Sequence, residues 1–131
     1  MTVYIPEDPT RMMRAKRSRY GNKKVNYMGM TFDSVGERDR FIYLQDAEQR
    51  GQIRNLRRQV TFDLGTCKYR ADFQYEAFRT PTPWEPRQWY TVIEDFKGGY
   101  KLPNDFRIKA KMMEERGTPI RIVKLSTAAI G

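Results

Sequence analysis

The chain has no histidine and one cysteine, Cys67, among its 131 residues. Serine–histidine hydrolysis, histidine–zinc sites, cysteine-based metal sites and an intrachain disulfide are therefore excluded. No apolar run approaches the roughly 20 residues of a membrane-spanning helix, and the first residues lack the charged-then-apolar order of a signal peptide. We therefore expect a cytoplasmic protein with no membrane partner, in which carboxylates and lysine are the available catalytic groups.

Positive charge is what the chain has in excess. It carries 25 Lys and Arg against 16 Asp and Glu, a formal net charge of +9, and its pI is near 9.8. Such a surface attracts polyanions, of which nucleic acid is the commonest soluble kind. Taken singly, each basic residue fits an ordinary solvated surface position, but together they predict a phosphate-binding surface. The candidates are Arg17, Arg19, Lys23, Lys24, Arg57, Arg58, Lys101, Arg107 and Lys109.

The length is enough for one hydrophobic core and too short for two. Prolines, glycines and basic residues dominate the first part of the chain, which favours an extended conformation there. We therefore expect a basic, partly extended arm over residues 1–31, a folded domain over 32–125 and a tail over 126–131.

A helix is expected to begin the folded domain. Ser34-Val35-Gly36-Glu37 has the form of a capping box and Gly51 is a natural C-terminal glycine, which predicts a helix over 34–50. The elements expected after it are a basic link at 50–58, strands at 59–64 and 68–75, a loop with Pro81, Pro83 and Pro86, a strand at 88–97, a helix at 104–116 and a strand at 120–125. This order, helix-strand-strand-strand-helix-strand, predicts a mixed α/β fold of α+β character, with a mixed central sheet flanked by helices.

Two of the predicted strands carry an acid where a buried strand should be apolar. Asp72 lies in the second strand, and Asp95 lies two residues before Lys97 in the third. Because side chains alternate along a strand, Asp95 and Lys97 share a face. Glu94 competes with Asp95 as a ligand but faces away from Lys97, so we favour Asp95. Burying such a carboxylate is costly unless it is paired, which indicates a functional site.

Several residues have a structural alternative. Glu37 occupies the third helical position of the capping box, so capping and catalysis are both open for it. Asp95 and Lys97 would form a plain surface ion pair if their strand lay at a sheet edge. Asp63, beside a glycine turn, fits a turn residue better than a ligand. Trp84, in the proline loop, fits either packing or contact with a partner.

The ordered set of motifs resembles the PD-(D/E)xK nuclease superfamily, in particular small phage-encoded endonucleases and Holliday junction resolvases. The residues that carry the resemblance are Phe32-Asp33-Ser34 leading into Glu37, Gln59 with Phe62, Tyr69-x-Ala71-Asp72-Phe73, and Val92-Ile93-Glu94-Asp95-Phe96-Lys97-Gly98. With the second helix and the last strand they span about residues 20–125. Ala71 departs from the pattern, since members of the superfamily often have proline there. The resemblance implies a restriction-endonuclease-like core.

The resemblance also implies the roles of the site residues. Asp72 and Asp95 would bind the metal, Phe96 would add its backbone carbonyl, and Glu37 would contact a water on the metal or a second ion. Lys97 would orient or help deprotonate the attacking water. Mg²⁺ is the expected cofactor, with Mn²⁺ as a substitute, because hard cations take carboxylate and carbonyl oxygens. One or two such ions can activate water and neutralise phosphate charge.

We therefore expect a Mg²⁺-dependent endonuclease of the Holliday junction resolvase type, located in the host cytoplasm if it is phage-encoded. It would act on branched DNA as a homodimer, since two opposed cuts need two symmetry-related sites. A duplex, flap or transposon-end nuclease of the same fold is the first alternative. The second is a non-catalytic basic nucleic-acid-binding protein, whose binding would depend steeply on salt and which would cut nothing.

Overall fold

The computed structural model describes residues 23–98 and 102–124. The chain divides into two compact units, Met1–Arg38 and Asp39–Gly131. Most of the predicted arm, residues 1–22, and the predicted tail lie outside the described residues, so the predicted domain boundaries stay predictions. Within the described part of the chain, no helix combines the length and the apolar character that crossing a membrane requires.

The first unit contains a short β-hairpin. Strands β1 (Val25–Tyr27) and β2 (Met30–Phe32) pair antiparallel, with Tyr27 opposite Met30. The two turn residues, Met28 and Gly29, have φ angles of 51° and 79°. Positive φ angles at both central residues are typical of the two-residue hairpin turn whose twist matches that of the paired strands. Gly29 adopts a positive φ without strain because it has no side chain. This hairpin was not predicted from the sequence, because Met-Gly is a weak hairpin signal.

Helix α2 (Val35–Gln49) begins in the first unit and continues into the second. The Ser34 hydroxyl oxygen accepts a hydrogen bond from the Glu37 backbone N–H at 3.1 Å, and Glu37 Oε1 accepts one from the Asp33 N–H at 3.4 Å. Both bonds satisfy backbone donors that the first helical turn leaves unpaired. The capping box and the helix that it predicted are confirmed.

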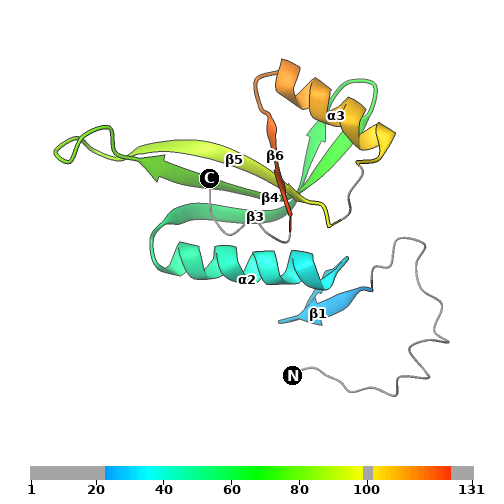
Figure 1. Ribbon diagram of the computed structural model, residues 1–131, viewed down its shortest axis with the longest axis horizontal. Coiled ribbons are helices and arrows are strands. Elements are labelled where there is room, and N and C mark those ends of the chain that lie inside the picture. The colour runs from blue at the N-terminus through cyan, green and yellow to red at the C-terminus, as the bar shows by residue number, and fades with distance from the viewer. Residues whose placement is uncertain (1–22, 99–101, 125–131) are drawn as a thin grey trace. The chain divides into compact units, whose positions relative to one another are not determined.

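The second unit is built on a mixed four-stranded sheet of order β3-β4-β5-β6 (Figure 1). Its strands are β3 (Ile53–Asp63), β4 (Lys68–Arg79), β5 (Gln88–Phe96) and β6 (Ile120–Val123). The first three run antiparallel, whereas β5 and β6 are parallel and are joined through helix α3 (Asn104–Glu115). A parallel pair needs such a crossover, which a helix usually supplies. The predicted mixed α/β fold and its element order are confirmed.

The helices cover opposite faces of this sheet. On one face, Phe41 of α2 stacks on Phe73 of β4 with ring centroids 6.3 Å apart. On the other face, a buried cluster joins α3 to the strands; its members are Tyr69, Ala71, Ile93, Phe106 and Met113. Consecutive residues of β5 therefore enter different cores, with β5 covered on both sides as expected of a central strand.

Strand β3 is longer than the sequence predicts. It begins at Ile53, so the predicted basic link was wrong, and Arg57 and Arg58 lie within a strand. Asn55 has a φ of 58°, and the register shifts between Arg54 and Arg57. A bulge of this kind interrupts the alternation by which a strand is recognised in a sequence. The prolines after β4 likewise hid its extension to Arg79.

A buried ionic network joins α2 to the sheet. Glu94 has no exposed surface, and its carboxylate accepts hydrogen bonds from Arg40 Nε and Nη2 at 2.9 and 2.7 Å. Arg121 donates a further bond at 3.0 Å, and the Tyr75 hydroxyl donates another. Burial lowers the pKa of Arg40, but the hydrogen bonds and charge of Glu94 outweigh this and leave the pKa raised. The Arg40 guanidinium is therefore charged in the folded protein, and it forms a buried ion pair with Glu94.

Replacement of Arg40 by alanine is predicted to destabilise the protein strongly, because it removes two hydrogen bonds to a buried carboxylate and leaves Arg121 as the remaining cationic partner of Glu94. We expect a loss of about 3 kcal/mol in the free energy of unfolding, measured by urea denaturation. Arg50→Ala is the matched control, since Arg50 pairs with Asp46 on the exposed surface, and it should change stability by about 0.5 kcal/mol or less. Equal effects of the two changes would contradict this account of the network.

Candidate functional site

The candidate site lies where β4 and β5 separate. Their pairing runs from Arg79 opposite Gln88 to Phe73 opposite Glu94, and it stops there. Just beyond, Asp72 Oδ2 accepts a hydrogen bond from the backbone N–H of Phe96 at 2.8 Å. Beyond the last backbone pair of β4 and β5, the Asp72 carboxylate is therefore the acceptor for the Phe96 N–H. This hydrogen bond holds the Asp72 side chain against the end of β5.

Asp95 lies on the α3 side of β5, with 4% of its surface exposed. Its Oδ2 accepts a hydrogen bond from the Tyr69 hydroxyl at 2.5 Å, and its Oδ1 lies 3.4 Å from Lys97 Nζ. Lys97 Nζ also lies 4.3 Å from the centre of the Phe106 ring, a distance at which a cation is attracted to the ring face. Asp95 and Lys97 share a face, as predicted, and the burial of Asp95 on a central strand makes this more than a surface ion pair.

Tyr69 links the two carboxylates electrostatically. Burial raises the pKa of the Tyr69 hydroxyl, and the charge of Asp95, its hydrogen bond to Asp95 and the charge of Asp72 raise the pKa further. The hydroxyl therefore stays protonated and donates to Asp95 at every working pH. Asp72 accepts a hydrogen bond from the N–H of Phe96, the residue that follows Asp95, so this bond brings the two acids to the same end of β5. The Tyr69 ring is held between Phe62 and Phe106, at centroid distances of 6.2 Å each.

Glu94 is occupied elsewhere. Its carboxylate belongs to the buried network with Arg40 and Arg121, on the face of β5 opposite to Asp95. Its hydrogen-bond partners among the described residues are Arg40, Tyr75 and Arg121, on the α2 side of the sheet. This arrangement supports the choice of Asp95 over Glu94 that strand alternation predicted.

A backbone irregularity lies opposite Asp72. Arg58 pairs with Phe73 and Val60 with Ala71, which leaves Gln59 at the register position of Asp72. Gln59 has a φ of 54°, a conformation that non-glycine residues adopt rarely and at a cost of about 1 kcal/mol or more. Such strain clusters at functional sites, and this one lies on β3 at the register position of Asp72.

The fourth predicted catalytic residue, Glu37, belongs to the first unit. Only 3% of its surface is exposed, and its Oε1 contributes to the start of α2 through the Asp33 N–H. The structural alternative for Glu37 is thus realised, and its catalytic role stays a prediction. Asp63 likewise adopts its structural alternative, since its Oδ1 accepts a hydrogen bond from the Gly65 N–H in the β3–β4 turn.

The predicted phosphate-binding residues are dispersed over several elements. Lys23 and Lys24 lie in the first unit, where Lys24 pairs with Asp33 at 3.2 Å. Arg58 lies with its guanidinium 5.8 Å from the Phe41 ring, on the α2 side of the sheet, and Arg57 is exposed on β3. Arg107 and Lys109 lie on α3, directly after the Phe106 that contacts Lys97. Arg17, Arg19 and Lys101 lie outside the described residues.

Three residues near the site were not predicted as functional. Tyr69 could have been suspected, because a tyrosine hydroxyl on an apolar strand face needs a partner. Gln59 was noted in a motif, but no sequence signal marks its positive φ. Lys124 was the third. The carbonyl of the preceding residue, Val123, accepts a hydrogen bond from the Lys97 N–H at 2.9 Å, and this bond between the ends of β5 and β6 brings the Lys124 backbone close to the site.

The donor set fits a hard divalent cation that keeps most of its waters. In residues 23–98 and 102–124, no three acidic or cysteine side chains gather as a metal cage. Mg²⁺ is commonly bound by one or two carboxylates and retains several waters, so a full cage is unnecessary. Asp72, Asp95 and the Phe96 carbonyl are the residues that could hold it.

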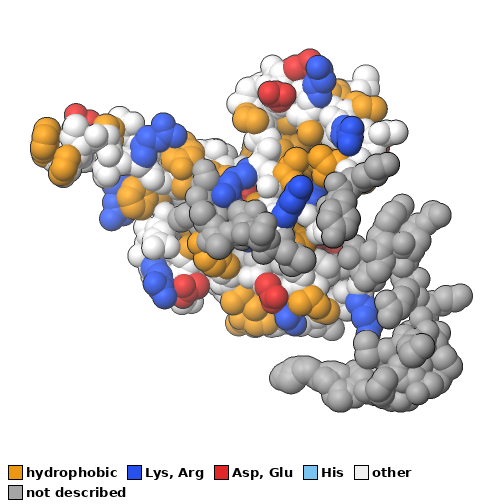
Figure 2. Space-filling view, in the orientation of Figure 1, with side chains coloured by type: hydrophobic (Ala, Val, Ile, Leu, Met, Phe, Trp, Pro, Cys, Tyr) orange, Lys and Arg blue, Asp and Glu red, His pale blue; other side chains and the backbone are white. Residues whose placement is uncertain are grey.

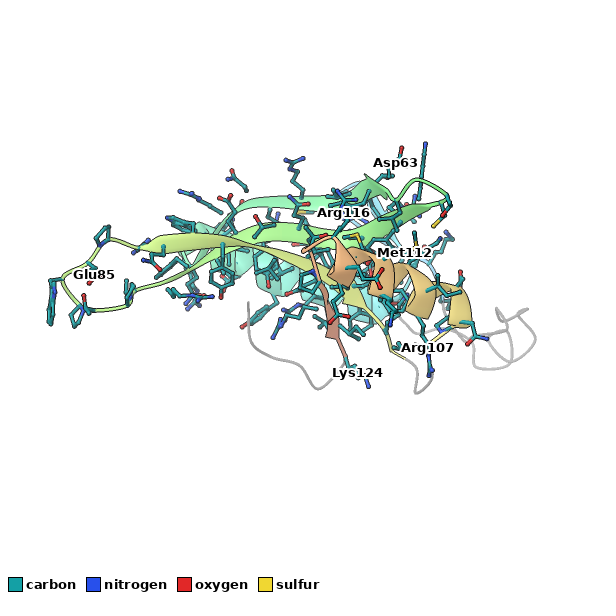
Figure 3. The ribbon with its side chains drawn as sticks, turned by 90° about the horizontal axis from the view of Figure 1, so that it is seen from above. Asp63, Glu85, Arg107, Met112, Arg116 and Lys124 are labelled. Atoms are coloured by element: carbon teal, nitrogen blue, oxygen red, sulfur yellow. The ribbon has the colours of Figure 1, made fainter. Side chains whose placement is uncertain are left out.

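An open hollow of about 440 Å³ lies on another part of the second unit, between the end of β3 and the last turn of α3 (Figure 3). Its lining is Asp63, Leu64, Met112, Glu115 and Arg116. Neither Asp72 nor Asp95 borders it. The acidic pair therefore lies outside this hollow, at the separation of β4 and β5.

The fold and site together define a mixed α/β protein, with a carboxylate pair beside a lysine at the separation of two central strands and a net charge of +9. The family model described as "Protein of unknown function (DUF1064)" matches residues 17–129, and the chain belongs to this family. No curated protein and no solved structure was found to match the chain.

Substitutions at Asp72 are predicted to separate its structural role from its charge. Asp72→Ala leaves the Phe96 N–H without its acceptor, which should reduce the free energy of unfolding by about 1–3 kcal/mol. Asp72→Asn keeps an oxygen that can accept this bond, so the loss should be smaller, about 1 kcal/mol or less. Urea denaturation of both variants checks this, and an asparagine variant as unstable as the alanine one would contradict the assigned hydrogen bond.

Proposed function

We propose that this protein is a Mg²⁺-dependent DNA endonuclease that hydrolyses phosphodiester bonds at branched DNA. The observation that carries the proposal is the grouping of Asp72, Asp95 and Lys97 at the end of β5. It supports the resemblance to the PD-(D/E)xK nucleases because the acids and the lysine occupy the elements that this superfamily requires. The helix-strand-strand-strand-helix-strand order supports it further.

Each residue has a role that its surroundings suit. Tyr69 occupies one oxygen of Asp95 and leaves Oδ1 towards Lys97. Asp72 is fixed by the Phe96 N–H, which orients its second oxygen away from that bond. Mg²⁺, when bound by these groups, would neutralise charge on the scissile phosphate and activate a water. Lys97 would orient that water and take part in moving its proton, because its ammonium group is held beside Asp95 by the ion pair and by the Phe106 ring.

The substrate is expected to be recognised by shape and phosphate positions. Among the predicted phosphate-binding residues of the second unit, Arg57 and Arg58 lie on β3 and Arg107 and Lys109 on α3. No helix among the described residues has the setting of the recognition helix of a helix-turn-helix motif. A homodimer would supply the two opposed cuts that a four-way junction requires. We expect this activity in the cytoplasm, which is the host cytoplasm if the protein is phage-encoded.

Cleavage of matched DNA substrates tests the function. A four-way junction, a flap and a linear duplex of the same sequence are each incubated with Mg²⁺, with Mn²⁺ and with a chelator. We expect cleavage with either metal, strongest on the junction, and none with the chelator. Preference for the flap or the duplex would assign the alternative substrate within the same fold. Binding to all three with no cleavage under any condition would show a non-catalytic nucleic-acid-binding protein.

Two variants locate the chemistry in that assay. Asp72→Asn should abolish cutting while junction binding survives, since it removes a metal ligand and keeps the hydrogen bond to Phe96. Lys97→Met should slow cleavage by roughly 10²- to 10⁴-fold, the usual contribution of one proton-transfer group. Lys68→Met makes the same change at an exposed position of β4 and should cut like the wild type. Full activity in Asp72→Asn would overturn the site assignment.

A further inference from the structure

Strands β4 and β5 continue beyond the rest of the sheet as a two-stranded arm. Strand β3 pairs with β4 as far as Ala77, whereas Phe78 and Arg79 pair with β5 alone. We call residues 78–89 the β-arm. It extends past both helices of the second unit, with the proline loop at its tip (Figure 1). An arm of this length buries little apolar area, so its stability must come from its own side chains.

Arginines and aromatic rings stack along the base of the β-arm. Phe78 and Trp89 meet edge to face at 5.2 Å. Arg87 lies over the Phe78 ring at 4.2 Å, and Arg79 lies over the Tyr90 ring at 4.5 Å. These contacts hold the strands together and fix the arginines in place.

The arginines of the β-arm bring positive charge to it. Arg54, at the base, lies over Trp89 and is neutralised by Glu76 at 2.6 Å. No such ion pair forms between Arg79 or Arg87 and the residues that the structure describes. Both side chains are exposed and held flat by rings, so their charges are available to an anionic partner.

Trp84 lies at the corner of the tip. The Glu85 N–H donates to the Thr82 carbonyl at 3.2 Å, which closes a turn with Pro83 and Trp84 at its centre. Proline presets the backbone of this turn position, and Trp84 is 80% exposed. Figure 2 shows hydrophobic side chains at this end of the arm, with an acidic side chain beside them and Lys or Arg side chains further along the arm. A large ring held outward on a preset turn can be bound with little loss of chain entropy.

Unpaired or end-stacked bases fit this tip better than a protein pocket. The chain carries a net charge of +9, and neither Arg79 nor Arg87 forms a salt bridge with an acidic residue in the described part of the chain. Nucleic-acid bases offer flat faces to aromatic rings, and their phosphates attract arginine. Inside a continuous duplex each base face is covered by its neighbour, so a ring can stack without the cost of unstacking bases only where the stack is interrupted.

We propose that Trp84 stacks on a base exposed at a branch point or other discontinuity of DNA, while Arg79 and Arg87 contact the flanking phosphates. The inference rests on the proposed function for the choice of DNA, and it adds a second contact remote from the acidic site. Trp89 and Asp95 are six residues apart on β5, or about 20 Å. The β-arm therefore recognises one part of the DNA while the acidic pair acts on another.

Intrinsic fluorescence tests the stacking without any cleavage. The chain has two tryptophans, so a Trp89→Phe variant reports Trp84 alone, and phenylalanine can replace the ring contact with Phe78. The full-length protein is titrated, in the presence of chelator, with a four-way junction or with a linear duplex of equal length and charge. We expect the Trp84 emission to be quenched by the junction and much less by the duplex. Unchanged emission on saturation with the junction would overturn the proposal, and so would equal quenching by both DNAs.

Binding by tip variants gives the second measurement. Trp84→Ala should weaken junction binding by roughly 5- to 150-fold, the range for loss of one base–ring stack, and duplex binding by about 2-fold or less. Trp84→Phe should recover most of the affinity. Ile42→Ala removes an exposed apolar side chain from α2 and should bind like the wild type. The proposal is refuted if Trp84→Ala binds the junction as tightly as the wild type. It is also refuted if the variant no longer self-associates while its affinity for the junction is unchanged, because the tip would then serve contact between copies of the chain.

The outcome is independent of the nuclease assay. If the wild-type chain cuts no DNA but its Trp84 signal and the variant affinities behave as described, the proposed function fails and the β-arm contact stands. If the chain cuts junctions at the acidic pair and Trp84→Ala neither binds nor cuts differently, the β-arm contact fails and the proposed function stands.

Discussion

Two consecutive acids, Glu94 and Asp95, are buried on opposite faces of the central strand β5, and much of the second unit is arranged to satisfy them. Each buried charge must be paired, because an uncompensated carboxylate in a protein interior is strongly destabilising. Glu94, on β5, accepts hydrogen bonds from Arg40 of α2 and Arg121 of β6, so its contacts link α2, β5 and β6. Asp95 is satisfied differently, by a neutral tyrosine hydroxyl and a partly exposed lysine.

The partners of the two acids differ between the two faces of β5. Glu94 belongs to a structural network, whereas Asp95 belongs to the candidate functional site. The carboxylate of Glu94 is saturated by hydrogen bonds and has no exposed surface. Asp95 keeps an oxygen directed to Lys97, and it has a second carboxylate, Asp72, near it where β4 and β5 part. The rigid anchoring of Glu94 also fixes the direction of Asp95, since neighbouring strand residues must point to opposite faces.

Much of this arrangement follows from short-range sequence rules. Strand alternation distinguished Asp95 from Glu94, and the capping box at Ser34 predicted the start of α2 correctly. The rules failed where the backbone departs from regular geometry: the bulge at Asn55 hid the first half of β3, and the positive φ of Gln59 left no sequence signal. Partners distant in the chain, such as Tyr69 for Asp95, depend on how the strands bend and were found from the fold alone.

Metal binding by the acidic pair is the claim on which the proposed chemistry depends, and electron paramagnetic resonance of Mn²⁺ measures it without DNA. We predict that the wild-type protein binds Mn²⁺ and that Mg²⁺ displaces it. Asp72→Asn and Asp95→Asn should each weaken binding by more than about tenfold, while Asp63→Asn, which changes an exposed turn carboxylate, should bind like the wild type. Absence of Mn²⁺ binding by the wild type, or equal binding by all four proteins, would contradict the assignment.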